Sequence, residues 1–234
     1  MEAPPTKGDP VRRTITASVA LALSLAAPPV AAAVIVGTPG ADTLVGTAGA
    51  DVVRARGGDD VVHGRDGADR LYGGAGADTL RGGPRGDVAI GGAGRDLLAG
   101  GGGRDTLFGD SADDRLVGGL GGDGLSGGPG DDRLRGGVGD DSLTDGIISE
   151  LSDEPGDDLL RGASGDDFLG VTGGRDRVFA GTGDDRLKTI DDGVPDLVDC
   201  GSGYDRVIYY PVDGTGGLDP LDVLTGCENV SVAR

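Results

Sequence analysis

Hydrophobic residues recur along this chain with a period of nine. From Gly37 onward twelve consecutive rows keep register, the first running from Gly37 to Val45. The eighth position is apolar in all twelve rows, and only Ala89 is small. Each row has a six-residue glycine-rich loop followed by three residues, so we predict a short strand with position eight inward and positions seven and nine outward. Repetition at a short fixed period is typical of a solenoid.

The polar positions are equally regular, because the sixth residue of every row in this first block is aspartate. After Thr144 the frame breaks for eight residues, 145–152, and rows then resume. Two degenerate rows with Asp196 and Asp205 follow the extra residues Thr189 and Ile190. The sixth-position aspartates of the regular rows are Asp42, Asp51, Asp60, Asp69, Asp78, Asp87, Asp96, Asp105, Asp114, Asp123, Asp132, Asp141, Asp158, Asp167, Asp176 and Asp185.

Composition restricts both the core and the partners. The 234 residues include 50 glycines, no tryptophan and only seven tyrosines and phenylalanines, so any core must be thin. The formal net charge of −19 argues against a nucleic-acid partner and makes cations the natural ones. One histidine and two cysteines offer little to a soft metal, whereas calcium accepts six to eight carboxylate and carbonyl oxygens. We therefore predict calcium as the bound ion.

The best rows match Gly-Gly-x-Gly-x-Asp-x-apolar-x at every defined position, as Gly73–Arg81 does. Over about 170 residues the chain thus resembles the RTX family, the hemolysin-type calcium-binding repeat proteins. The resemblance implies an all-β fold, a parallel β-roll (β-solenoid) in which successive rows lie on alternate sides. It also implies calcium between loops stacked on one side, held by backbone carbonyls and by the sixth-position aspartates, which are the predicted metal ligands. Five gaps on each side of the first block give roughly ten sites.

Some rows depart from this pattern. In the row from Gly82 to Ile90, Arg85 replaces the fourth-position glycine and Ala89 replaces the larger apolar residue, so both turn and core are weakened. Several rows carry a second acidic residue at position five, which is either solvated charge beside the site or an extra ligand. These residues are Asp59, Asp113, Asp131, Asp140, Asp157, Asp166 and Asp184.

The two ends of the chain lack the repeat. Residues 1–33 have the features of a signal peptide: basic Arg12 and Arg13, an apolar stretch over 15–27, and small residues at 31–33. The apolar stretch is too short for stable membrane insertion, so we expect a secreted or cell-surface protein that begins near Val34. Residues 209–234 are expected to form a C-terminal cap. Cys200 and Cys227 are expected to form a disulfide, the alternative being two free thiols.

The predicted organisation is a signal peptide at 1–33, repeat blocks at 34–144 and 153–208 separated by the insertion 145–152, and the cap at 209–234. Such a chain would be a structural or binding module that folds on meeting extracellular calcium. The alternatives are an accessory or chaperone-like tail of an exported enzyme, and a calcium-dependent adhesin. We predict no enzymatic activity, because the Gly-x-Ser-x-Gly match at 124–128 follows from the repeat and the one histidine, His63, lies seven rows away.

Overall fold

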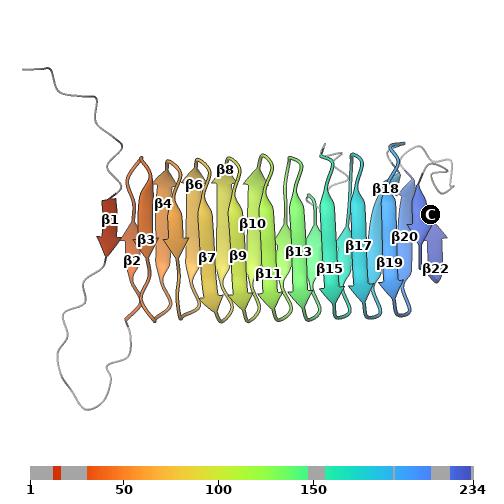
Figure 1. Cartoon of the computed structure of the whole chain (residues 1–234), viewed down its shortest axis with the longest axis horizontal. Helices are drawn as coiled ribbons and strands as arrows, with labels where there is room; N and C mark the ends of the chain where they lie inside the picture. The colour runs from red at the N-terminus through yellow and green to blue at the C-terminus, as the bar shows by residue number, and fades with distance from the viewer. Residues whose placement is uncertain (1–12, 17–30, 147–155, 192, 212–221, 233–234) are drawn as a thin grey trace, which may run out of the picture.

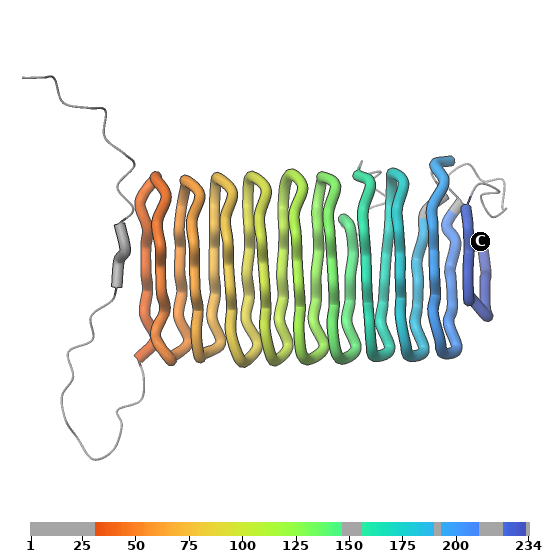
Figure 2. The backbone as a smooth tube through the Cα atoms, in the orientation of Figure 1, coloured from red at the N-terminus to blue at the C-terminus, as the bar shows by residue number. Residues whose placement is uncertain are grey.

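The computed structural model describes residues 13–16, 31–146, 156–191, 193–211 and 222–232, with the backbone alone at 13–16. Its strands stack along one axis into an elongated solenoid, each coil contributing one strand to each of two sheets (Figures 1 and 2). Both sheets are parallel and eleven-stranded within the described ranges. These ranges contain no helix, and thus none that could cross a membrane. The predicted all-β parallel β-roll is confirmed.

We call the sheet of odd-numbered strands the odd sheet and the other the even sheet. The odd sheet contains, in spatial order, β1 (Arg13–Thr16), β3 (Asp42–Val45), β5 (Val61–His63), β7 (Thr79–Pro84), β9 (Leu97–Gly102), β11 (Arg115–Leu120), β13 (Arg133–Val138), β15 (Leu159–Ser164), β17 (Arg177–Thr182), β19 (Leu197–Ser202) and β21 (Val223–Thr225). The even sheet contains β2 (Val34–Val36), β4 (Val52–Gly57), β6 (Arg70–Ala75), β8 (Val88–Ala93), β10 (Thr106–Ser111), β12 (Gly124–Ser126), β14 (Ser142–Thr144), β16 (Phe168–Gly170), β18 (Arg186–Asp191), β20 (Arg206–Pro211) and β22 (Asn229–Val232).

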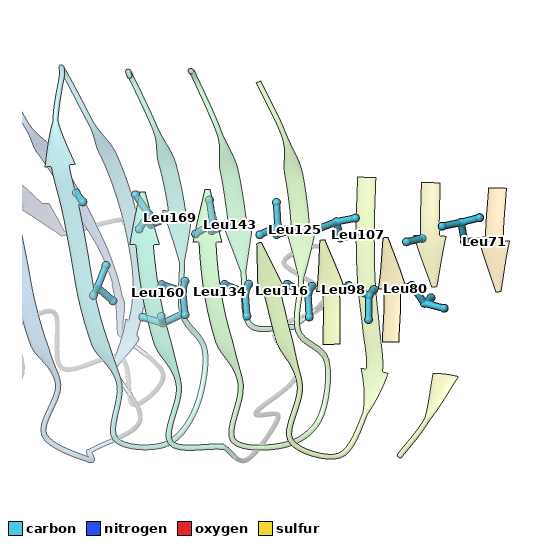
Figure 3. Close-up of a cluster of buried hydrophobic side chains, with 14 of the residues drawn as sticks. Leu71, Leu80, Leu98, Leu107, Leu116, Leu125, Leu134, Leu143, Leu160 and Leu169 are labelled. Carbon is cyan, nitrogen blue, oxygen red and sulfur yellow. The ribbon is translucent and has the colours of Figure 1, made fainter. Parts of the chain in front are cut away.

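The core lies between the sheets and consists of the eighth-position side chains. Leu80, Leu98 and Leu116 from the odd sheet form one row, and Leu107 and Leu125 from the even sheet lie in the facing row (Figure 3). All five are at most 2% exposed, as predicted for position eight. Burying one such leucine contributes about 1.5–3 kcal/mol, so this narrow core gains its stability by repetition along the axis.

Most strands are longer than the three residues that we predicted. β6 and β8 pair over Arg70↔Val88 to Ala75↔Ala93, which adds positions one to three of the following row. Glycine makes the extension possible: Gly74, inside β6, has φ +117°, a conformation that is strained for other residues. Arg85, which replaces glycine at position four of its row, is forced to φ +113°. The backbone of this row is thus strained at Arg85, and the predicted weakening of the turn stays a prediction.

The frame break does not interrupt either sheet. β13 pairs with β15, and β14 with β16, in a register offset by 26 residues instead of 18. The offset of 26 exceeds 18 by eight, the length of the predicted insertion, so the strands on either side of it stay in the same two sheets. The second irregularity lies later than expected, because Thr189 and Ile190 are paired within β18 and the two extra residues come after that strand.

The C-terminal segment extends both sheets. The predicted boundary between 208 and 209 falls within β20, and β21 and β22 then add the last strand of each sheet. Cys200 and Cys227 form a disulfide with their Cα atoms 5.2 Å apart, which confirms the predicted bond. The last coil is thereby linked covalently to the segment that covers it.

Candidate functional site

The sixth-position aspartates stand in two ladders, one along each side of the roll. In the first stack, loops run from the even to the odd sheet, and the amide of Asp42 donates to Oδ1 of Asp60 at 2.6 Å. In the second stack, loops run the other way, and the amide of Asp51 donates to Oδ1 of Asp69 at 2.7 Å. Rows alternate sides, as the resemblance implied, and each carboxylate except that of Asp42 accepts from an amide of the coil before it.

Both ladders continue through the irregular parts of the chain. Asp132 donates to Asp158 at 2.7 Å across the insertion. Asp185 likewise donates to Asp205 at 2.9 Å across the second irregularity. All sixteen predicted ligands are buried, with no more than 4% of any residue exposed. The structure thus brings every one of them into a ladder, although each has neighbours only above and below.

The second carboxylate oxygen distinguishes these aspartates from ordinary buried ones. In fourteen of the sixteen predicted ligands one carboxylate oxygen is buried without a hydrogen-bond partner, the exceptions being Asp51 and Asp158. The partnerless atom is Oδ1 in Asp42 and Oδ2 in the other thirteen. An unsatisfied buried acceptor costs about 1–3 kcal/mol, and more when it is charged. A row of such oxygens therefore fits a bound cation well.

Backbone oxygens lie next to these partnerless atoms. A Cβ at Gly73 would collide with Oδ2 of Asp78 and would lie 2.6 Å from the carbonyl oxygen of Gly91 in the next coil. The first-position glycine thus leaves room for a carboxylate oxygen and a carbonyl oxygen to approach the same point. Such donors suit a hard cation. The described ranges contain no group of three His, Cys, Asp or Glu side chains that could hold a metal, so carbonyls would have to complete each site.

Burial raises the pKa of most carboxyl groups in the ladders. The pKa of Asp96 rises to about 7, chiefly because burial disfavours its charged form, although the Asp78 amide opposes the rise. For the same reason the pKa of Asp132 rises to about 8 and that of Asp176 to about 9, with neighbouring carboxylates adding to the effect. These loops therefore favour either a proton or a cation on each carboxylate.

The fifth-position aspartates form outer ladders that sequence reasoning did not foresee. Oδ1 of Asp131 accepts from the amide of Asp157 at 3.0 Å, and Oδ1 of Asp166 accepts from the amide of Asp184 at 2.9 Å. These bonds run opposite to those of the inner ladders, since here the carboxylate binds the coil that follows it. Each of these side chains joins adjacent loops, a role distinct from both solvated charge and metal ligation.

Sequence reasoning also left four members out of the predicted ligand set. Asp196 and Asp205 continue the ladders, and beyond them the amide of Asp196 donates to Oδ1 of Asp222 at 2.8 Å. The amide of Asp205 donates to Glu228 Oε2 at 2.9 Å. The aspartates at 196 and 205 still stand two residues before an apolar position, a signal that could have included them. Asp222 and Glu228 follow their partners by 26 and 23 residues, offsets that a nine-residue search cannot detect.

A comparison with protein-family models gives one match, the RTX calcium-binding nonapeptide repeat (4 copies). Overlapping matches cover residues 36–143, and a further match covers 152–187, so more than half of the chain is included. No curated protein matches the chain. The matched residues contain the rows whose aspartates form the two ladders. The chain therefore belongs to the family of RTX calcium-binding nonapeptide repeat proteins, a family whose repeats bind calcium.

Proposed function

We propose that this protein is a secreted structural or binding module that folds when it binds extracellular calcium through its sixth-position aspartates. The observation that carries the proposal is the set of buried carboxylate oxygens, one in nearly every nine-residue row, that have no hydrogen-bond partner. Calcium would supply the positive charge and the six to eight coordination positions that bring such oxygens together.

The residues proposed to hold calcium are the sixteen of the regular rows together with two that continue the ladders. They are Asp42, Asp51, Asp60, Asp69, Asp78, Asp87, Asp96, Asp105, Asp114, Asp123, Asp132, Asp141, Asp158, Asp167, Asp176, Asp185, Asp196 and Asp205. In each except Asp42, an amide of the preceding coil orients the carboxylate, and carbonyl oxygens of the glycine-rich loops would supply the remaining ligands. These hydrogen bonds thus position the carboxylates, and each proposed site would take its ligands from two adjacent loops of one stack.

Coupled folding follows from charge and core size. Strands lie about 4.8 Å apart, so ionised carboxylates on adjacent loops repel each other at close range. The opposing stabilisation comes from a core of one large apolar residue in most rows. We propose that the chain is unfolded where calcium is scarce and folds at roughly 10⁻⁴ to 10⁻³ M calcium, the range of extracellular modules.

We also propose that the protein is exported and has no catalytic activity. The signal-like residues 1–33 support export, but most of them lie outside the described residues. Burial is the main cause that lowers the pKa of the single histidine, His63, and the charges of Arg81 and Arg65 lower it further. A general base paired with a carboxylate would show the opposite influence. The surroundings of His63 thus support a structural role.

A calcium titration of the full chain, followed by circular dichroism, tests the folding proposal. We expect little β-signal in excess chelator, a cooperative rise as calcium approaches the millimolar range, and reversal when chelator is added again. Magnesium at the same concentration is the control, since its tighter octahedral geometry should support little folding. Full β-signal in chelator, or an equal response to magnesium, would show that the proposed mechanism is wrong.

A further inference from the structure

Five arginines gather on the outer surface of the odd sheet. They are Arg115 on β11, Arg133 and Arg135 on β13, Arg161 on β15 and Arg177 on β17, and all are exposed. We call these five residues the arginine face. They occupy positions seven and nine of their rows, the two outward positions of the strand. A chain with a net charge of −19 thus concentrates positive charge on four neighbouring strands.

The arginines are placed opposite one another. Arg115 pairs in register with Arg133, and Arg135 pairs with Arg161. Parallel strands lie about 4.8 Å apart, and like charges directly opposite each other on a sheet are destabilising. The pairing therefore works against folding, and an anion placed along the pairs would remove that repulsion.

The protein itself neutralises these charges only slightly. Within the described ranges the structure contains one ion pair, between Arg95 and Asp113, and neither residue belongs to the arginine face. Arg133 lowers the pKa of Asp113, but its contribution is smaller than those of the Asp131 amide and Arg95. The guanidinium of Arg161 lies over the ring of Phe179, 5.4 Å from its centroid. The five arginines thus remain available to an external anion.

The positive charge is confined to one side of these coils. On the even sheet, positions seven and nine of β10, β12 and β14 hold only uncharged residues: Thr106, Phe108, Gly124, Ser126, Ser142 and Thr144. The one further exposed charge on these strands is the acidic Asp110 of β10. A binding surface is therefore one-sided, and the residues that would take part belong to alternate rows. Because alternate rows return to the same sheet, the repeat can present one charge pattern on one face and another on the opposite face.

Acidic rims border the arginine face on both edges. Asp131 and Asp157 precede β13 and β15 in the first loop stack, whereas Asp140 and Asp166 follow these strands in the second stack. A six-residue strand separates the rims by about 20 Å, and the five arginines span about 14 Å along the axis. The available surface is thus a basic strip between two acidic borders.

We propose that the arginine face binds a linear anionic polysaccharide lying along the roll axis. The charge of such a chain complements the arginines, and its narrow width keeps it between the acidic rims. A duplex about as wide as the strip, or a flat membrane, would bring negative charge against those rims. Arginine suits the role, because its planar guanidinium donates paired hydrogen bonds to carboxylate or sulfate groups. The inference goes beyond calcium-dependent folding and requires only that the roll be folded.

The test measures binding of the full chain, in saturating calcium and low salt, to dextran sulfate, hyaluronan and neutral dextran. We expect binding to one or both anionic polymers, no binding to neutral dextran, and weakening as salt rises. Preference for hyaluronan would assign a carboxylated ligand, and preference for dextran sulfate a sulfated one. A single-stranded oligothymidylate is included, because tighter binding of this probe would overturn the polysaccharide proposal.

A matched pair of variants locates the site. Arg133→Gln/Arg135→Gln should weaken binding about tenfold, whereas Arg186→Gln/Arg206→Gln, which removes the same charge from the even sheet, should change it less than about twofold. Circular dichroism of the same samples separates loss of binding from loss of the calcium-dependent fold. Equal weakening by the two variants, or no binding by a chain that is shown to be folded, would overturn the proposal.

Discussion

The sixth-position aspartate has different hydrogen-bond partners in the middle of the roll and near its N-terminal end. In mid-roll, Oδ1 of Asp96 accepts from the Asp78 amide at 2.7 Å and Oδ2 is left without a partner. Near the N-terminal end, both oxygens of Asp51 are satisfied, since Oδ1 accepts from the Ala33 amide at 2.6 Å and Oδ2 from the Thr47 amide at 2.5 Å. The row position alone therefore does not decide how strongly a carboxylate requires a cation.

The C-terminal end resembles the N-terminal one. Oδ1 of Asp222 accepts from the amide of Asp196, and Oδ2 accepts from the hydroxyl of Tyr209. Tyr209 is 1% exposed and directly follows the three repeat residues 206–208, where most rows have the first-position glycine. The hydroxyl of Tyr209 thus binds a carboxylate oxygen of the kind that has no partner in mid-roll. We infer that the need for calcium is greatest in the middle of the roll, because protein groups satisfy both oxygens of Asp51 near one end and of Asp222 at the other.

The largest effect should come from changing the charge of the whole mid-roll ladder at once. In chelator, the folded pKa values are raised, to about 6 for Asp60 and about 9 for Asp176, above the ordinary value of 3.8. The folded chain therefore binds more protons than the unfolded chain, and its stability falls as pH rises from about 4 to about 9. We expect clearly more β-signal at pH 5 than at pH 8 in chelator.

Saturating calcium should largely remove this dependence, because protons and calcium compete for the same oxygens of the folded chain. Because protons already stabilise the folded chain at pH 5, the calcium concentration at half-folding should be lower at pH 5 than at pH 8, as measured by circular dichroism at both pH values. A β-signal in chelator that is independent of pH, or that increases with pH, would show that burial of the mid-roll carboxylates does not limit the calcium-free fold.

A single substitution in mid-roll should have a smaller but local effect. Asp96→Ala removes a carboxylate that has neighbours in both adjacent coils, and it leaves the Asp78 amide without its acceptor. We expect the calcium midpoint to rise about tenfold or more, and the folding transition to split, since coupling along a linear array is cut.

Asp42→Ala is the matched control for this substitution. Asp42 has a ladder neighbour only at Asp60, and one of its oxygens already accepts from the Thr38 amide at 2.5 Å. Its loss should fray the first coil and shift the midpoint less than about twofold. Equal shifts for the two variants would mean that the sites act independently, and a larger shift for Asp42→Ala would contradict the stacked arrangement.

The regular part of this molecule could be predicted because one short period specifies both its core and its candidate site. Once aspartate and an apolar residue recur every nine residues, the inward side chains follow for each row, from Leu44 to Leu187, and the resemblance to the RTX family implies the alternation of sides. The structure places in the ladders all sixteen residues that the same period identified, together with four that it did not. Their hydrogen bonds could not be predicted, because a period does not show whether an amide or a metal ion satisfies each oxygen.

The irregular parts show what a period cannot encode. Asp145 occupies the place of a first-position glycine beside the insertion, where its Oδ2 accepts from the Thr172 amide at 2.5 Å. Tyr209 and Asp222 meet across a segment that has no repeat. The arginine face was also missed, because residues 18 and 26 apart become neighbours only when the alternation of rows and the insertion are both known. These contacts join residues far apart in the sequence, so they could be found only once the pairing of the strands was known.

Removal of the predicted signal peptide should have the smallest effect on the fold. We expect N-terminal sequencing of secreted protein to begin within a few residues of Val34, and recovery of intact Met1 outside the cell would contradict this. Cleavage there would remove β1 from the edge of β3, and with Ala33 it would remove one of the amides that bind Asp51. The Thr47 amide would still bind the other oxygen, and terminal coils contribute little to global stability. The calcium midpoints of the full and cleaved chains should thus differ less than about twofold, whereas a shift as large as that of Asp96→Ala would show that the first coil needs its protein partners as much as the middle needs calcium.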